Sequence, residues 1–562
     1  MATYVNDLRL KEIATGDESG TWGTSTNTNL ELIAEKFGTG SEALSDASTA
    51  TITMADGSSD AFRSFSLTLT GSLSQACTVT LAPNTLSNVW VIQNSAGDTV
   101  TLTQGSGANV VIPNGGIKMI ATDGAGSGAA VTDVLDLTGG TGNVGLGSGS
   151  LGASITTATS NVAIGANSGD ALTTGLRNTF VGDNTGSEVT IGSNNIAIGR
   201  NSLDAEVAGS LSVAVGTGTL TTQSFSTATD SYNTAVGHAA GNAMTTGIKN
   251  TLLGANAGDH LTDADFNVAI GYLALDADTL GSGSTAIGLQ ALTTQNFTTA
   301  TTTYNVAVGF QAGLSVTTGT SNNLVGGLGG DALTTGSYNQ VLGTAALGAD
   351  TQGSRSIAIG HAALLAQNFT TATDVYNVAI GHNAGLSVTT GSENTLLGGV
   401  AGDALTTGGS NIVVGVSALG ADTQGSRSVA VGRSALQDQN FTTATDNYNV
   451  AVGYEAGKRI TTGIKNILIG GLAGDALTDA DFNVAVGNAA LSADTLGSAS
   501  TAIGTSALAA QNFTTATNAY NVAVGFETGQ SITTGVNNTL IGGLAGDALT
   551  IGRDNVAVGY AA

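Results

Sequence analysis

The chain has 562 residues, of which 82 are Gly, 2 are Pro and 4% are aromatic. This composition excludes a collagen-like chain and supplies too few large side chains for several thick cores, so we expect one thin core repeated many times. A net charge of −26 argues against nucleic-acid binding, and the single Cys77 excludes an intrachain disulfide framework. No apolar run approaches the length of a membrane span, and no secretion signal is predicted.

The first 40 residues are predicted to contain one helix. Polar residues at 24–29 are candidate helix caps, and Leu30, Ile33 and Phe37 follow at helical spacing. Residues 38–50 are rich in Gly, Ser and Ala, and we expect a linker there.

Residues 50–137 alternate short apolar segments with turn signals, which is typical of a small β-sandwich. Trp90 lies in one of these segments and is predicted to belong to the core. The predicted strands cover 65–69, 79–81, 89–92, 100–102, 110–112 and 119–121. We therefore divide the chain into a helix-containing N-terminal segment (1–40), a β-sandwich (41–138) and a repeat region (139–562).

The repeat region determines the predicted fold class. A Gly closes each short apolar run, as in Asn161-Val162-Ala163-Ile164-Gly165, and we call it the marker glycine. The marker glycines stand at 165, 182, 199, 216 and 237, so that three intervals of seventeen are followed by one of twenty-one, and the same series then starts again. Four rungs thus form one superrepeat, and 24 marker glycines are present if Gly147 is counted. This period predicts an all-β protein whose main part is a long β-solenoid of about 24 rungs.

Each rung is predicted to contain two short strands. One is the Asn-Val-Ala-Val/Ile-Gly run, and the other is represented by Arg459–Thr462. Because side chains alternate across a strand, we place the Val/Ile columns inside the coil and the Ala column outside, against a symmetry axis. This arrangement predicts a homotrimer, and the alternative is a single-chain solenoid with Ala on a flat outer face. Five Leu residues replace Ala and are predicted to plug the trimer axis: Leu252, Leu324, Leu396, Leu468 and Leu540.

The longest rung of each superrepeat carries a recurring aromatic insertion. Its residues are predicted either to brace the shaft or to form a ridge that binds host-surface glycans weakly and repeatedly. These residues are Phe225, Tyr232, Phe297, Tyr304, Phe369, Tyr376, Phe441, Tyr448, Phe513 and Tyr520.

Two parts of the chain resemble known families. Gly20-Thr21-Trp22-Gly23, with the polar residues that follow it and Leu30–Ile33, resembles the virion-attachment segment of tailed-bacteriophage tail fibres, and the sandwich resembles a phage-fibre module. The repeats are similar to the β-roll heads of trimeric autotransporter adhesins. The resemblance implies a trimeric tail fibre of the virion that attaches to tail or adaptor proteins and contacts host-surface glycan or protein. It assigns attachment to Trp22, Asn27, Asn29, Leu30, Ile33 and Phe37.

The carboxylate and His residues are the candidates for catalysis and metal binding. A catalytic carboxylate pair needs to occur only once, whereas the Asp259 and Asp278 columns recur in successive superrepeats, so they are interpreted as turn caps or solvated side chains and no enzymatic activity is predicted. No cofactor is predicted, although three chains together could hold Ca²⁺ between Asp columns. The four His residues, at 238, 260, 361 and 382, are interpreted as surface turn residues without a ligand set.

Two alternatives to a tail fibre remain open from the sequence. One is a glycan-degrading tailspike, and the other is a fibre attached to the capsid. The last copy stops in mid-coil at Ala562, so we also expect a partner protein at the tip or a longer fibre.

Overall fold

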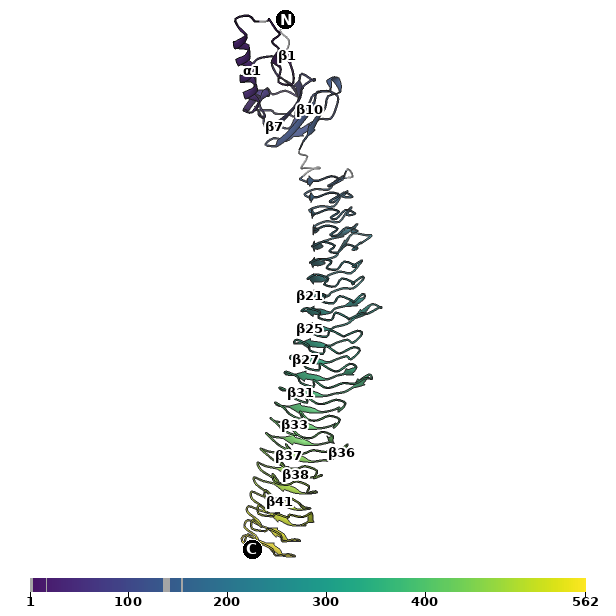
Figure 1. Ribbon diagram of the computed structural model, residues 1–562, viewed down its shortest axis with the longest axis vertical. Coiled ribbons are helices and arrows are strands. Elements are labelled where there is room, and N and C mark those ends of the chain that lie inside the picture. Colours follow the sequence, from purple (N-terminus) through teal and green to yellow (C-terminus); the bar gives the residue numbers. More distant parts are fainter. Residues whose placement is uncertain (1–3, 17, 135–141, 153–154) are drawn as a thin grey trace. The chain divides into compact units, whose positions relative to one another are not determined.

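The computed structural model describes residues 4–16, 18–134, 142–152 and 155–562 (Figure 1). The chain forms two compact units, Met1–Gly139 and Gly140–Ala562. The predicted boundary at 138/139 lies outside the described residues. The all-β class is confirmed, because the described residues contain a single α-helix, α1 (Trp22–Lys36). In this part of the chain, no helix is long and apolar enough to cross a membrane.

The first unit contains two sheets that share one hydrophobic core. All six predicted strands are present, and β3, β4 and β11 are additional. In spatial order, the first sheet contains β11 (Val131–Asp133), β10 (Ile117–Asp123), β7 (Ser87–Ser95), β5 (Ser66–Gly71) and β3 (Thr39–Leu44). The second contains β4 (Thr49–Thr53), β6 (Cys77–Ala82), β8 (Val100–Thr103) and β9 (Val110–Ile112). β1 (Tyr4–Val5) and β2 (Leu10–Lys11) pair antiparallel as a separate two-stranded sheet. The two short 3-10 helices of this unit are η1 (Ala61–Arg63) and η2 (Gly126–Gly128).

The predicted linker at 38–50 is wrong, because β3 and the beginning of β4 occupy it. Leu44 and Ile52 of these strands are buried in the core. Gly40 serves close packing rather than flexibility, since a Cβ at this position would lie 2.2 Å from the Ala61 carbonyl oxygen.

The chain alternates between the two sheets from β3 to β8, and neighbouring strands within each sheet are parallel. The first unit is thus a short coil, which the antiparallel strands β9, β10 and β11 close. Trp90 is fully buried, stacks on Phe62 at a centroid distance of 4.7 Å and donates its Nε1–H to the Phe62 carbonyl. Its predicted place in the core is confirmed.

The second unit is a β-solenoid whose rungs stack on one another (Figure 1). Each rung contributes one three-residue strand to a single parallel sheet of 24 strands. The predicted rung number is confirmed. The strands are β12 (Val144–Leu146), β13 (Val162–Ile164), β14 (Thr179–Val181), β15 (Ile196–Ile198), β17 (Val213–Val215), β19 (Thr234–Val236), β20 (Thr251–Leu253), β21 (Val268–Ile270), β23 (Thr285–Ile287), β25 (Val306–Val308), β26 (Asn323–Val325), β27 (Gln340–Leu342), β29 (Ile357–Ile359), β31 (Val378–Ile380), β32 (Thr395–Leu397), β33 (Ile412–Val414), β35 (Val429–Val431), β37 (Val450–Val452), β38 (Ile467–Ile469), β39 (Val484–Val486), β41 (Thr501–Ile503), β43 (Val522–Val524), β44 (Thr539–Ile541) and β45 (Val556–Val558).

A second strand in every rung was predicted, and this is wrong. Arg459–Thr462 forms a turn that still bonds from rung to rung, since the Thr461 amide donates to the Thr478 carbonyl at 2.9 Å. Among the described residues of the shaft, second strands occur only around the longest rung of each superrepeat, as the parallel pairs β16 (Gly209–Ser210) with β18 (Thr229–Asp230), β22 (Gly281–Ser282) with β24 (Thr301–Thr302), β28 (Gly353–Ser354) with β30 (Thr373–Asp374), β34 (Gly425–Ser426) with β36 (Thr445–Asp446), and β40 (Gly497–Ser498) with β42 (Thr517–Asn518).

The predicted direction of the strand side chains is also wrong. The central residue of each strand, which is Ala in most rungs, faces the coil interior, where Ala379 and Ala451 are fully buried, while the flanking Val378 and Ile380 lie half-buried on the outer face. The physical reason is space: Leu side chains from the turns, such as Leu364, already fill much of the narrow interior. In most rungs only a methyl group fits beside them.

The five Leu residues predicted to plug a trimer axis lie instead inside the coil of one chain, with 0–1% exposure. They occupy rungs whose turns carry Gly where other rungs carry an inward Leu. A Cβ on Gly385 would lie 2.6 Å from Leu396 Cδ1, so this Gly makes the space that Leu396 fills. Leu252, Leu324, Leu396, Leu468 and Leu540 are therefore core residues.

The marker glycines and the Asn residues hold the stack together. Gly381 adopts φ +145°, and a Cβ there would lie 2.3 Å from the Gly398 carbonyl oxygen of the next rung. The buried Asn side chains form a ladder: the Asn178 backbone N–H donates to Asn161 Oδ1 at 2.8 Å, and the Asn195 backbone N–H donates to Asn178 Oδ1 at 2.9 Å. Each rung is thus bonded to the next through side chains as well as backbone.

Candidate functional site

An apolar column runs along the outer face of the 24-stranded sheet. The residue before each marker glycine, from Leu146 to Val558, is Val, Ile or Leu in every strand, and we call this set the outer apolar column. Its members are half-buried or exposed in the single chain, with Leu342 at 51% and Leu397 at 42%. The residue two positions earlier is Val or Ile in many strands and polar in others. The outer apolar column is therefore an extended, unpartnered apolar surface.

A second column contains exposed aromatic residues directly before the buried Asn of the strand motif, and we call it the aromatic column. Tyr304 is 66% exposed and Tyr376 is 52% exposed. Phe266, Tyr338 and Phe482 also belong to it, and the sequence prediction missed them because they lie outside the longest rung of the superrepeat. The column consists of Tyr232, Phe266, Tyr304, Tyr338, Tyr376, Tyr448, Phe482 and Tyr520.

Cationic side chains are interleaved with the aromatic column. The Arg355 guanidinium lies 5.3 Å from the Tyr338 ring centroid and 5.7 Å from that of Tyr376, and it pairs with Asp374 at 2.8 Å. Arg427 lies 5.4 Å from the Tyr448 ring. These contacts hold the cations along the shaft by cation–π and ionic attraction.

The predicted aromatic ridge divides into two groups in the structure. The Phe side chains, such as Phe369, are 6–9% exposed and lie under the loops, whereas the Tyr side chains belong to the exposed aromatic column. The buried Phe side chains are placed to brace the loops, whereas the exposed Tyr side chains are accessible to a binding partner. The Phe members are Phe225, Phe297, Phe369, Phe441 and Phe513.

A buried carboxylate anchors the aromatic insertion. Asp422 is fully buried and accepts hydrogen bonds from the Phe441 amide at 3.1 Å, the Gly425 amide at 3.0 Å and Gln439 Nε2 at 2.6 Å. Burial raises the pKa of Asp422, and likewise of Asp278, above the ordinary aspartate value. These carboxylates cap turns, as predicted, but they are not solvated.

The residues assigned to virion attachment lie on or beside α1. Trp22, Leu30 and Phe37 are 63%, 59% and 84% exposed, and Asn27 is exposed, so they form an accessible surface that is largely apolar. Ile33 is 36% exposed. Asn29 instead holds the helix to β2, because its Nδ2 donates to the Lys11 carbonyl at 3.0 Å and its Oδ1 accepts from the Lys11 amide at 3.1 Å.

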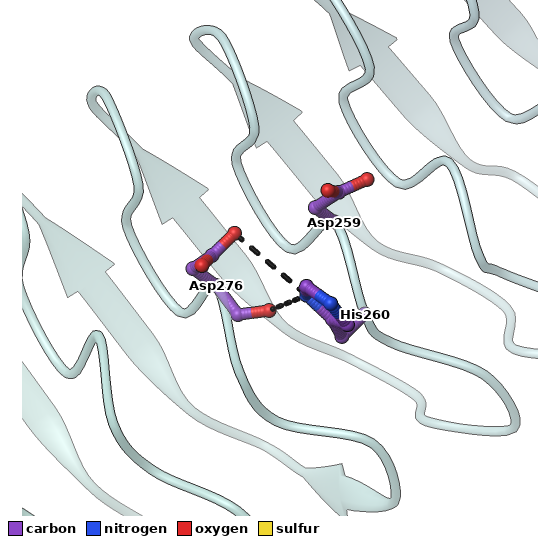
Figure 2. Close-up of side chains that lie close together, drawn as sticks. All are labelled: Asp259, His260 and Asp276. Atoms are coloured by element: carbon purple, nitrogen blue, oxygen red, sulfur yellow. Dashed lines mark hydrogen bonds and ion pairs between the residues drawn. The ribbon is translucent and has the colours of Figure 1, made fainter.

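One His residue has partners that the sequence prediction missed. Ligand atoms of Asp259, His260 and Asp276 all lie within 4.8 Å of one another on two neighbouring rungs (Figure 2). His260 Nδ1 lies 3.0 Å from the Asp276 carbonyl oxygen and 3.9 Å from Asp276 Oδ1. Burial raises the pKa of both carboxyl groups, and the neighbouring imidazole partly opposes this. The rung period brings these residues together, although His260 and Asp276 are 16 positions apart in the sequence.

Comparisons with protein-family models, with curated proteins and with solved structures find no match to this chain. Its function is therefore argued from the two columns, the helix surface and the cluster around His260.

Proposed function

We propose that this protein is a homotrimeric structural fibre, specifically a phage tail fibre whose solenoid shaft extends host recognition away from the virion. The observation that carries the proposal is the outer apolar column, which is unbroken over 24 strands. At about 4.8 Å per strand the column is about 110 Å long, and its surface is on the order of 1,000 Å². Monomeric proteins rarely leave a contiguous apolar patch larger than a few hundred Å² in water.

The periodicity of this surface argues that its partner is another copy of the chain. An unrelated protein would have to present complementary side chains at the same strand spacing over the whole length. A second copy has the same strand spacing because it has the same sequence and fold. Self-association of identical chains commonly gives closed symmetry. Three copies that turn this narrow column toward a common axis would cover it completely, which supports the trimer.

The exposed surface of α1 supports attachment to a virion through tail or adaptor proteins. Trp22, Leu30 and Phe37 present large apolar side chains that a partner would cover. The aromatic column supports weak, repeated contact with host-surface glycan or protein, because stacking surfaces recur along the shaft. The proposed role is structural and needs no catalytic step; a partner protein at the distal tip forms part of the proposal.

Light scattering of the purified chain tests the trimer. One chain has a mass of 55.0 kDa, and the expected result is three times this value. Replacing Ile380 and Leu397 by Lys on the outer face should give the single-chain mass, whereas Tyr376→Ser in the aromatic column should leave the trimer intact. A wild-type mass equal to that of one chain or of two chains would overturn the proposed trimer.

Electron microscopy of virions that carry the protein tests whether it is attached to the tail or to the capsid. Antibodies against the shaft should label the tail and not the capsid. Trp22→Ser together with Phe37→Ser should remove the label while the purified variant remains trimeric. Labelling of the capsid would favour the alternative of a capsid-attached fibre.

A further inference from the structure

We propose that Asp259, His260 and Asp276 bind one divalent transition-metal ion of the zinc type, which connects two neighbouring rungs of a single chain. Asp259 and His260 lie in the turn after β20, and Asp276 lies in the turn after β21. Figure 2 shows the three side chains on these adjacent turns. The site is formed within one chain and does not depend on the proposed fibre function.

The ligand atoms of the three residues lie at a spacing that suits a shared metal ion. All three residues offer an atom within 4.8 Å of the others. Metal–ligand bonds of about 2.0–2.2 Å at tetrahedral angles place neighbouring ligand atoms about 3.3–3.6 Å apart, so side-chain rotations that draw the three atoms together would complete the site. The contact between His260 Nδ1 and the Asp276 carbonyl oxygen, at 3.0 Å, restrains the ring close to the carboxylates.

One carboxylate oxygen of the cluster lacks a hydrogen-bond donor. Asp276 Oδ1 is shielded from solvent and accepts no hydrogen bond, and its 3.9 Å separation from His260 Nδ1 is too long for one. One superrepeat earlier the equivalent oxygen belongs to Asp204, and the Ser187 hydroxyl donates to it. At the later position Asp259 replaces that serine, so a second carboxylate stands where the donor was. A cation would satisfy both carboxylates.

The later tandem copies lack two of the three residues. An Asp recurs at the position of Asp259 in the later superrepeats, but the residues equivalent to His260 and Asp276 differ. Where His260 stands, the later copies carry Ala332, Ala404, Ala476 and Ala548, and where Asp276 stands they carry Gly348, Gly420 and Ser492. Two ligating side chains thus depart from the later repeat pattern together, and the fold brings them into contact.

The donor set indicates the class of metal. An imidazole nitrogen with two carboxylates suits zinc and related first-row ions, whereas calcium and magnesium prefer sites made entirely of oxygen. Water would complete the coordination at this exposed turn, where the His260 side chain is 60% exposed. The strongly negative net charge also attracts a cation to the shaft.

Calorimetric titration of the chelator-treated full chain with zinc chloride tests the proposal. Wild type should bind one zinc ion per chain in a saturable step. The double variant His260→Ala, Asp276→Gly carries the residues that other copies use at these places, so its fold should persist, and its zinc affinity should fall at least tenfold. Circular dichroism and the melting temperature without metal would verify that it folds.

Asp475→Asn provides the matched control. Asp475 occupies the place of Asp259 three superrepeats further along the chain, and its Oδ1 also lacks a hydrogen-bond partner, but Ala476 and Ser492 replace the other two ligands. This variant should bind zinc like wild type, and calcium should not compete for the site. The proposal would be overturned by the absence of a saturable step in wild type, or by equal zinc affinity in wild type and the double variant.

Discussion

The two units are both coils with parallel strands, but they fill their interiors in opposite ways. In the first unit, strands of up to nine residues enclose large side chains, among them Trp90, Phe62 and Met54. In the shaft, three-residue strands enclose Ala and a Leu from the turn, as with Ala358 and Leu364. The comparison teaches that the width of the coil decides which side chains go inside.

This difference changes how stability is distributed. The first unit has one compact core of its own, whereas the shaft core continues from Leu151 to Ala545 through contacts between neighbouring rungs. A substitution in the first unit should therefore affect one cooperative unit, and a substitution in the shaft should act mainly on adjacent rungs.

The largest effect is expected from Trp90→Ala. Removing this fully buried ring from its stack with Phe62 should destabilise the first unit by about 3–5 kcal/mol. Thermal unfolding followed by circular dichroism should show an earlier transition for the first unit and an unchanged transition for the shaft. A shift of both transitions by the same amount would show that the two cores are not independent.

A smaller effect is expected from two adjacent residues of β32. Leu396 is fully buried and Leu397 is 42% exposed. Leu396→Ala should cost about 2–5 kcal/mol in local shaft stability. Leu397→Ala should cost about 1 kcal/mol or less within one chain and should mainly weaken association.

Hydrogen exchange of the rungs around β32 would measure the first effect, and concentration-dependent light scattering would measure the second. Faster hydrogen exchange around β32 in Leu397→Ala than in Leu396→Ala would contradict the assignment of Leu396 to the interior and Leu397 to the outer face.

The smallest effect is a difference in pH dependence between the two units. Burial raises the pKa of Asp422 in the shaft, so its contribution to stability is present at acidic pH and is lost as pH rises through the folded-state pKa. In the first unit, backbone hydrogen bonds lower the pKa of Asp46 and Asp123, so their contribution is present near neutral pH and is lost on acidification. Lowering the pH from neutral should therefore stabilise the shaft relative to the first unit.

Melting temperatures of both transitions measured from strongly acidic pH, below the ordinary aspartate pKa, to neutral pH would check this. Asp422→Asn should reduce the pH dependence of the shaft transition and leave that of the first unit unchanged. An unaltered shaft profile in this variant would contradict the assignment to buried carboxylates.

The sequence alone determined the features that depend on local chemistry and on counting. The marker glycines established 24 rungs, because only Gly permits positive φ so close to the carbonyl of the next rung, as at Gly381. The Asn ladder followed from the same period, because identical side chains stack in register. Alternation also identified the six central strands of the first unit.

Only the tertiary structure decided which face of each shaft strand is interior. The alternation of side chains along a strand defines two faces but does not say which face has room for Val. Leu side chains from the turns fill the coil interior, so Ala379 faces inward and Ile380 faces outward. The linker prediction failed for a similar reason, since Gly40 serves a close contact with Ala61. The cluster of Asp259, His260 and Asp276 arises because stacking makes neighbours of residues that the chain separates by a full rung.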